Sequence, residues 1–172
     1  MKKLLTIAIA ATMLLTALAG CFPKNGTEST KTPEELAQLY DDAITQNGGE
    51  MVEYNPVITE KKENDLSSMI VEALGLQSED MQAFGISVSM MNIQAYGIAA
   101  VMPAEGKTEA VQEALQAYID RQRQSFEQYL ADQYEVAKNA RLETLKDGTV
   151  LMVMCQDQDT VFDAISTAIL EG

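Results

Sequence analysis

Two cysteines, with carboxylates and methionines spread along the chain, are the side chains that could carry chemistry in this sequence. Asp157 and Asp159, with Asp147 earlier in the chain, could bind calcium through carboxylate oxygens. Their spacing lacks the glycine and the final glutamate of a calcium-binding loop. Capping of a helix start explains Asp157 and Asp159 equally well. We therefore predict no metal site, and a weak calcium site near these two acids is the alternative.

The remaining thioether, thiol and carboxylate groups have ordinary structural explanations. Thioethers suit Cu(I), but Met152 and Met154 fall on one face of an expected strand, where methionine fills core space. Cys155 follows the same apolar run, which predicts a buried and unreactive thiol. Adjacent acids such as Glu34-Glu35 could serve a glycosidase, yet among 26 acidic residues such pairs arise by chance.

The sequence contains no histidine, and this excludes several kinds of site. It has no Ser-His-Asp or Cys-His arrangement, no histidine metal site and no zinc-protease helix. Ser87 and Ser89 stand in an expected strand without the glycines of a nucleophile elbow. No glycine-rich loop precedes a lysine as a phosphate cradle requires. We predict no catalytic residue and no cofactor.

The other cysteine, Cys21, ends the first apolar run. Lys2 and Lys3 precede the uncharged run 4–18, which is shorter than the roughly 20 residues of a membrane-spanning helix. Such a start is typical of an export signal. The box Leu18-Ala19-Gly20-Cys21 resembles the lipobox of bacterial lipoproteins. In that family the cysteine thiol carries a diacylglyceryl thioether, and a peptidase cuts just before it.

The lipobox resemblance implies a domain organisation and a location. Residues 1–20 would be a lipoprotein signal peptide, residues 21–32 a flexible polar tether, and residues 33–172 a single domain. Lipidation of Cys21 would hold the chain on the extracytoplasmic face of the cell membrane, since two acyl chains suffice for stable anchoring. An ordinary secretory signal that happens to carry a cysteine is the alternative.

The chain is strongly acidic, with 12 Lys and Arg against 26 Asp and Glu and a net charge of −14. Removing residues 1–20 leaves 10 basic residues against 26 acids, a net charge of −16. Such a surface repels phosphate backbones, so we predict no nucleic-acid partner. It also disfavours lying flat on anionic lipid, so the lipid would serve as a tether.

Hydrophobic periodicity predicts an α+β fold. Thr32 with Glu35 forms a capping box for the first helix. A half-buried strand is expected over 84–90, where apolar residues alternate with small and polar ones. The expected helices span 33–47, 65–74, 108–130 and a last segment after Asp157 or Asp159; strands span 84–90, 96–102, 140–144 and 150–155, with an extended stretch or edge strand in 50–59. The order gives an antiparallel sheet of about four strands with helices packed on one face.

Three stretches of sequence carry a second resemblance. They are Met91-Asn92 with the apolar strand after it, residues 126–134 (FEQYLADQY), and Asp147-Gly148 before the last strand. From about Phe84 to Ile169 the chain resembles a lipoprotein family of clostridia-type Gram-positive bacteria, known as domain of unknown function 4358. The resemblance implies a lipid-anchored envelope protein and supplies no activity and no catalytic residue.

Three functions follow as hypotheses. The first is a non-enzymatic binding or accessory module that engages an envelope protein or a wall component at the outer face of the cytoplasmic membrane. The alternative is a small-molecule or metal-ion binding lipoprotein that serves a transporter. A hydrolase that uses carboxylates alone is the third.

Overall fold

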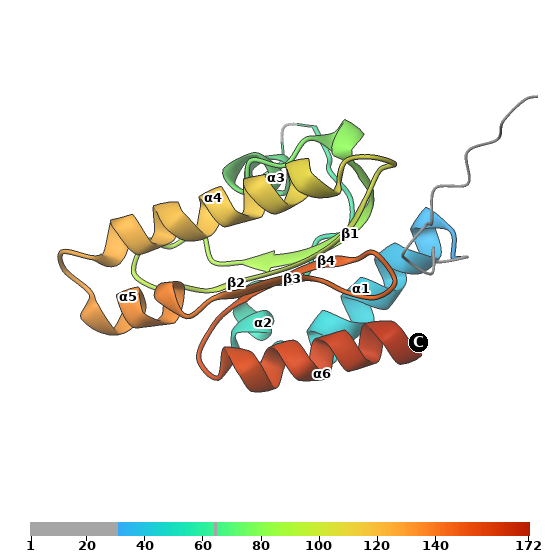
Figure 1. Ribbon diagram of the computed structural model, residues 1–172. Helices are drawn as coiled ribbons and strands as arrows, with labels where there is room; N and C mark the ends of the chain where they lie inside the picture. Colours follow the sequence, from blue (N-terminus) through green and yellow to red (C-terminus); the bar gives the residue numbers. More distant parts are fainter. Residues whose placement is uncertain (1–30, 64) are drawn as a thin grey trace, which may run out of the picture.

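A four-stranded antiparallel sheet with the order β1-β2-β4-β3 lies at the centre of the fold (Figure 1). The strands are β1 (Met81–Val88), β2 (Gly97–Pro103), β3 (Arg141–Thr144) and β4 (Val150–Met154). The computed structural model describes residues 31–63 and 65–172, so the predicted signal peptide, Cys21 and nearly all of the predicted tether lie outside the described residues. The predicted α+β class and four-stranded antiparallel sheet are confirmed.

Helices cover both faces of this sheet (Figure 1), and the prediction that they pack on one face is wrong. One face carries α1 (Pro33–Asn47), α2 (Met51–Tyr54) and α6 (Gln158–Glu171); the other carries α3 (Leu66–Ala73), α4 (Thr108–Phe126) and α5 (Ala131–Lys138). The physical reason is the composition of β2 and β4, which are buried at every position. Strands that are apolar on both sides need a cover on both sides.

The expected half-buried strand over 84–90 is also buried on both sides and ends earlier, at Val88. The face of β1 that carries Gly85 and Ser87 packs against α1. Gly85 lies so close to Tyr40 that a Cβ added to it would be 2.6 Å from the Tyr40 Cβ. Ser87, which has no exposed surface, donates a 2.5 Å hydrogen bond from Oγ to the Asn55 carbonyl oxygen. Its Oγ also accepts a 3.0 Å bond from the Tyr96 hydroxyl. Small residues thus bring the helix close, and the serine is buried with its hydrogen bonds made.

Helix boundaries depart from the expectation at two places. The predicted helix over 108–130 ends at Phe126 and is followed by a separate helix, α5, which was not predicted. No proline or glycine marks this break, and α5 buries only Ala137, so its periodic signal is weak. Part of the predicted extended stretch 50–59 is the helix α2, while Ile58 pairs with Ile86 in a single antiparallel bridge. The capping box of Thr32 and Glu35 is confirmed.

Four buried hydroxyl and thiol groups make the fold sensitive to high pH. Burial raises the pKa of Tyr96 and of Tyr118 from 10.0 to about 12, and that of the Cys155 thiol from 9.0 to about 11. Burial also raises the pKa of Tyr40, whose hydroxyl donates a 2.8 Å bond to Thr149 Oγ1. At a pH between the ordinary and the raised pKa of each group, the folded chain therefore keeps a proton that the unfolded chain has released.

We expect the free energy of unfolding to fall as the pH rises above about 9. Below the ordinary pKa values both states hold these protons, so the four groups add no pH dependence there. Above them the unfolded state is the less protonated one, and stability falls by about 1.4 kcal/mol per pH unit for each group between its two pKa values. Urea titrations in steps from neutral to strongly alkaline pH, with tyrosinate absorbance, measure this. An unfolding free energy that stays constant through the alkaline range would contradict it.

Candidate interaction surface

The carboxylates that could have bound calcium do not come together. Asp147 lies in the turn before β4, where it accepts hydrogen bonds from the backbone N–H and hydroxyl of Thr149 at 3.0 and 2.8 Å. Asp157 and Asp159 lie beyond the other end of β4, about 16 Å away for a strand of five residues. Within residues 31–63 and 65–172, no group of three or more potential ligands could hold a metal ion.

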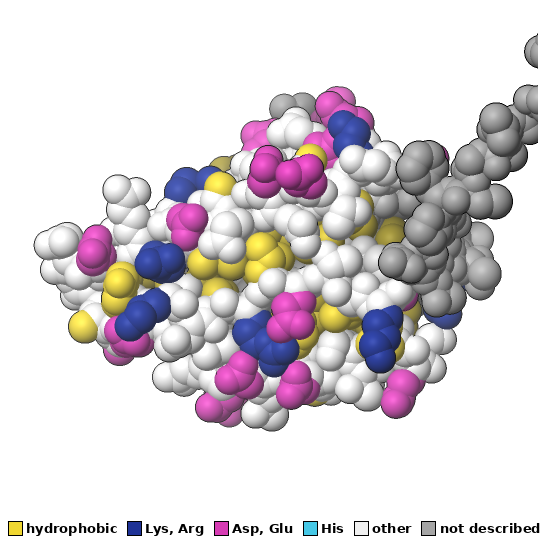
Figure 2. Space-filling view, in the orientation of Figure 1, with side chains coloured by type: hydrophobic (Ala, Val, Ile, Leu, Met, Phe, Trp, Pro, Cys, Tyr) yellow, Lys and Arg dark blue, Asp and Glu magenta, His cyan; other side chains and the backbone are white. Residues whose placement is uncertain are grey.

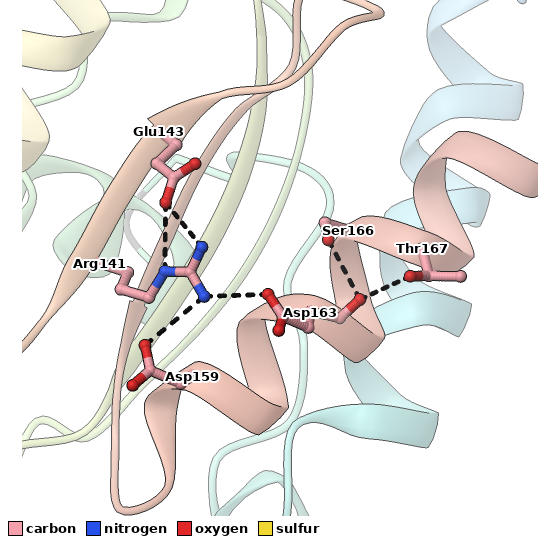
Figure 3. A network of polar contacts seen from close by, with 6 residues as sticks. All are labelled: Arg141, Glu143, Asp159, Asp163, Ser166 and Thr167. Carbon is pink, nitrogen blue, oxygen red and sulfur yellow. Dashed lines mark hydrogen bonds and ion pairs between the residues drawn. The ribbon is translucent and has the colours of Figure 1, made fainter.

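The expectation that the side chain of Asp157 or Asp159 caps α6 is wrong. Asp157 is at the N-cap position with φ +57°, and its side chain makes no capping hydrogen bond. Asp159 lies inside the first turn and contacts Arg141 at 3.5 Å. Its role is therefore in an ion-pair network between β3 and α6 (Figure 3).

Arg141 is the centre of this network (Figure 3). Its Nη2 and Nε donate to one oxygen of Glu143 at 2.7 and 3.1 Å, and its Nη1 donates to Asp163 at 2.9 Å. The guanidinium carbon lies 3.8 Å from the centre of the Phe162 ring. The bond to Glu143 raises the pKa of Arg141 above its usual value. The network fastens α6 to β3 and places charge on an edge strand, which discourages pairing with another sheet.

The sulfur atoms of Cys155, Met152 and Met154 are buried as predicted. Cys155 is buried, and the raised pKa of its thiol disfavours the reactive thiolate. Met152 and Met154 are fully buried in the core under α4. None of these three side chains is placed to meet a ligand.

Large apolar side chains are exposed at the end of the β1–β2 hairpin. Met90, Met91 and Ile93 are 47%, 58% and 62% exposed. Tyr129, which is 56% exposed, joins them from the corner between α4 and α5, and its hydroxyl donates a 3.1 Å bond to the Asn92 carbonyl oxygen. We call Met90, Met91, Ile93 and Tyr129 the loop-end surface. Figure 2 shows hydrophobic side chains among charged ones at this α4–α5 corner, at the left of the view.

Polar contacts hold the backbone beneath the loop-end surface. The N–H of Ala95 donates to Gln133 Oε1 at 2.9 Å, and the N–H of Met91 donates to Ser89 Oγ at 3.2 Å. Gln133 in turn donates to Asp132 at 2.9 Å, and this bond holds the pKa of Asp132 below its usual range. The loop is thereby fastened to the start of α5, so its apolar side chains are presented from a fixed backbone.

The segments that build the loop-end surface carry acids and no bases. Residues 89–96 contain no charged side chain, and residues 127–137 contain only Glu127, Asp132 and Glu135. The basic residues that flank 127–137 along the chain, Arg123 and Lys138, form ion pairs with Asp120 at 3.3 Å and with Glu135 at 3.1 Å. Glu127, which lines a hollow together with Arg123, and Asp132 are the acids of these segments that no base in the described residues pairs with, so residues 127–137 carry net negative charge.

Residues 57–155 match the model of a protein family described as a domain of unknown function, DUF4358. The chain belongs to this family. The match begins before the expected Phe84 and ends at Cys155, ahead of α6. Comparisons with curated proteins and with solved structures each returned no match. In the part of the DUF4358 chain that the structure describes, no helix is long and apolar enough to cross a membrane.

The loop-end surface lies wholly inside the matched DUF4358 region, and sequence reasoning missed it. Met90 falls in the strand expected over 84–90, and Tyr129 falls in the helix expected over 108–130, so neither was expected at an exposed corner. The sequence did contain one signal. Two of the stretches that carry the family resemblance are Met91-Asn92 and residues 126–134, and in the structure they contact each other through Tyr129 and Asn92. Met90 and Tyr129, which were assigned to two different elements, thus belong to one exposed surface.

The DUF4358 fold places this surface far from where the described chain begins. Lys31 and Leu36 line a pocket together with Gln82 and Gly148, at the end of the sheet where β1 starts. The loop-end surface follows the other end of β1, whose eight residues span about 26 Å. Figure 1 shows the start of α1 and the α4–α5 corner at opposite ends of the sheet.

A second hollow lies beside α3 in the DUF4358 domain. Lys61, Asp65, Met69 and Glu72 contribute to its wall, and Lys61 pairs with Glu72 at 3.7 Å. Small-molecule sites are usually apolar clefts with a few convergent polar groups. This hollow is shallow and mostly polar, so its charged groups are already solvated or paired.

Proposed function

We propose that this chain is a lipid-anchored envelope protein whose folded domain binds another envelope protein through the loop-end surface. The observation that carries the proposal is the exposure of Met91, Ile93 and Tyr129 on a backbone that hydrogen bonds hold in place. Methionine and aromatic residues are enriched in protein interfaces. A fixed loop also loses little conformational entropy when a partner binds. This supports a binding or accessory role.

The lipid anchor at Cys21 and the position of the surface support one orientation. As a flexible coil, residues 21–31 would span roughly 17–20 Å from the membrane to Lys31. The loop-end surface lies at the far end of β1 from Lys31. The proposed attachment at the Lys31 end therefore leaves the loop-end surface accessible to a partner. The alternative, a small-molecule or metal-ion module serving a transporter, would have to use the hollow beside α3, whose polar and open form suits it less.

Photocrosslinking in the native membrane tests this proposal. A photoreactive residue at position 91 of the full chain should give one discrete protein adduct. The matched control is position 69, because Met69 on α3 is also 58% exposed and should give no such adduct. Adducts that are absent at position 91, or identical at both positions, would overturn the proposed interaction.

The anchor is tested separately with a clickable fatty-acid label. We expect label on the wild-type chain and none on Cys21→Ala, because the thioether needs the thiol. Crosslinking from position 91 should recover the same partner in Cys21→Ala at lower yield, since the domain carries recognition and the lipid raises the local concentration. Label that remains on Cys21→Ala would contradict lipidation at this residue.

A further inference from the structure

We infer that the loop-end surface takes a protein segment whose apolar side chains are flanked by lysine or arginine. This inference rests on the proposed function and adds the chemistry of the partner. Met90, Met91, Ile93 and Tyr129 form the apolar part of the surface. The negative charge beside it comes from Asp132, which is joined to the loop through Gln133, and from Glu127, two residues before Tyr129. An apolar centre with a charged rim is the usual anatomy of a transient interface.

A second copy of the chain does not suit this surface. A symmetric dimer would bring together two copies of a surface whose segments 89–96 and 127–137 carry acids and no bases, so no opposite charge would be available across the interface. The net charge of −14 adds long-range repulsion between copies.

An anionic bilayer does not suit it either. The surface carries no lysine or arginine on residues 89–96 or 127–137 that could attract lipid headgroups. It also lies at the opposite end of the sheet from Lys31, the first residue that the structure describes.

A cationic partner gains from the same features. Complementary charge at the rim speeds encounter and selects against acidic competitors. The Tyr129 side chain offers an apolar ring, and its hydroxyl is already bonded to the loop. Burial of Met91, Ile93 and the Tyr129 ring then holds the complex after encounter.

Three synthetic amphipathic peptides test the inference on the full chain in nanodiscs of zwitterionic lipid. One has leucine and lysine faces, one has glutamate in place of lysine, and one has serine in place of leucine. We expect the leucine–lysine peptide to bind at least tenfold more tightly than the other two, a difference of about 1.4 kcal/mol. It should also slow hydrogen exchange in residues 89–96 and 127–134.

Matched variants separate the two contributions. Met91→Ser should weaken binding several-fold, while Met69→Ser, at an equally exposed methionine, should not. Glu127→Gln with Asp132→Asn should remove most of the salt dependence of binding between about 0.1 and 1 M salt, where the Debye length falls from about 10 to 3 Å. Equal binding of the leucine–lysine and serine–lysine peptides, or protection elsewhere on the chain, would overturn the inference.

The two proposals fail in different ways. Peptide binding at the loop-end surface without a native adduct from position 91 would support the surface chemistry and contradict the envelope partner. A native adduct from position 91 together with preference for the glutamate peptide would support the partner and contradict its basic character.

Discussion

Replacing Phe126 with alanine is expected to destabilise the fold by about 3–5 kcal/mol, the usual cost of emptying a large aromatic site. Phe126 has no exposed surface and belongs to the core under α4. It is also the last residue of α4, and its carbonyl accepts hydrogen bonds from the N–H groups of Tyr129 and Leu130 at 3.2 and 3.1 Å. Urea unfolding followed by circular dichroism measures the loss.

The same change should reach the loop-end surface. The Phe126 and Tyr129 rings lie 6.2 Å apart, so removal of one ring leaves the other without its neighbour at the corner. We expect crosslinking from position 91 to fall in Phe126→Ala, and Phe126→Leu, which keeps most of the apolar volume, to retain more of both stability and crosslinking. A loss below about 1 kcal/mol in Phe126→Ala would mean that the corner does not depend on this ring.

Gly85→Ala is expected to have the second largest effect, about 1–3 kcal/mol or more. The added methyl group would lie 2.6 Å from the Tyr40 Cβ and 3.2 Å from its carbonyl carbon. These atoms belong to the α1 framework and cannot rotate away, so the helix itself must shift. The Tyr40–Thr149 hydrogen bond would be strained by the same displacement.

Gly97→Ala on β2 is the matched control. There an added methyl group meets only side-chain atoms of Tyr118, Val88 and Met152, at 3.3 to 3.4 Å. Side chains adjust more easily than a helix backbone, so Gly97→Ala should cost clearly less. Thermal unfolding of both variants beside the wild type decides this, and equal losses would contradict the close approach of α1 at Gly85.

Local signals explain why the class and most elements could be predicted. The capping box at Thr32 and Glu35 gave the start of α1, and the turn at Asp147-Gly148 gave the β3–β4 hairpin. Each signal depends on residues within one or two turns of the chain, where the physics is local. The break after Phe126 has no such signal, because it follows from packing of α5 against the body of the fold.

Tertiary packing explains what could not be predicted. Gly85 and Ser87 looked like the solvent side of a strand, since neither residue type shows that a helix lies against it. Their burial depends on Tyr40 and Asn55, which come much earlier in the chain. The loop-end surface likewise depends on a contact between Asn92 and Tyr129, which only the folded chain brings together.

The position of β4 in the sheet has a consequence for how the domain is made. β4 is the last strand of the chain but pairs with β2 on one side and β3 on the other. Until residues 150–154 are available, the finished β1–β2 hairpin has a bare hydrogen-bonding edge and no partner for it. Because the chain is made from its N-terminus, this edge of β2 stays open to pairing with other strands until nearly the whole chain has been made. Assembly depends on a late, long-range closure, the kind of contact that makes folding slow.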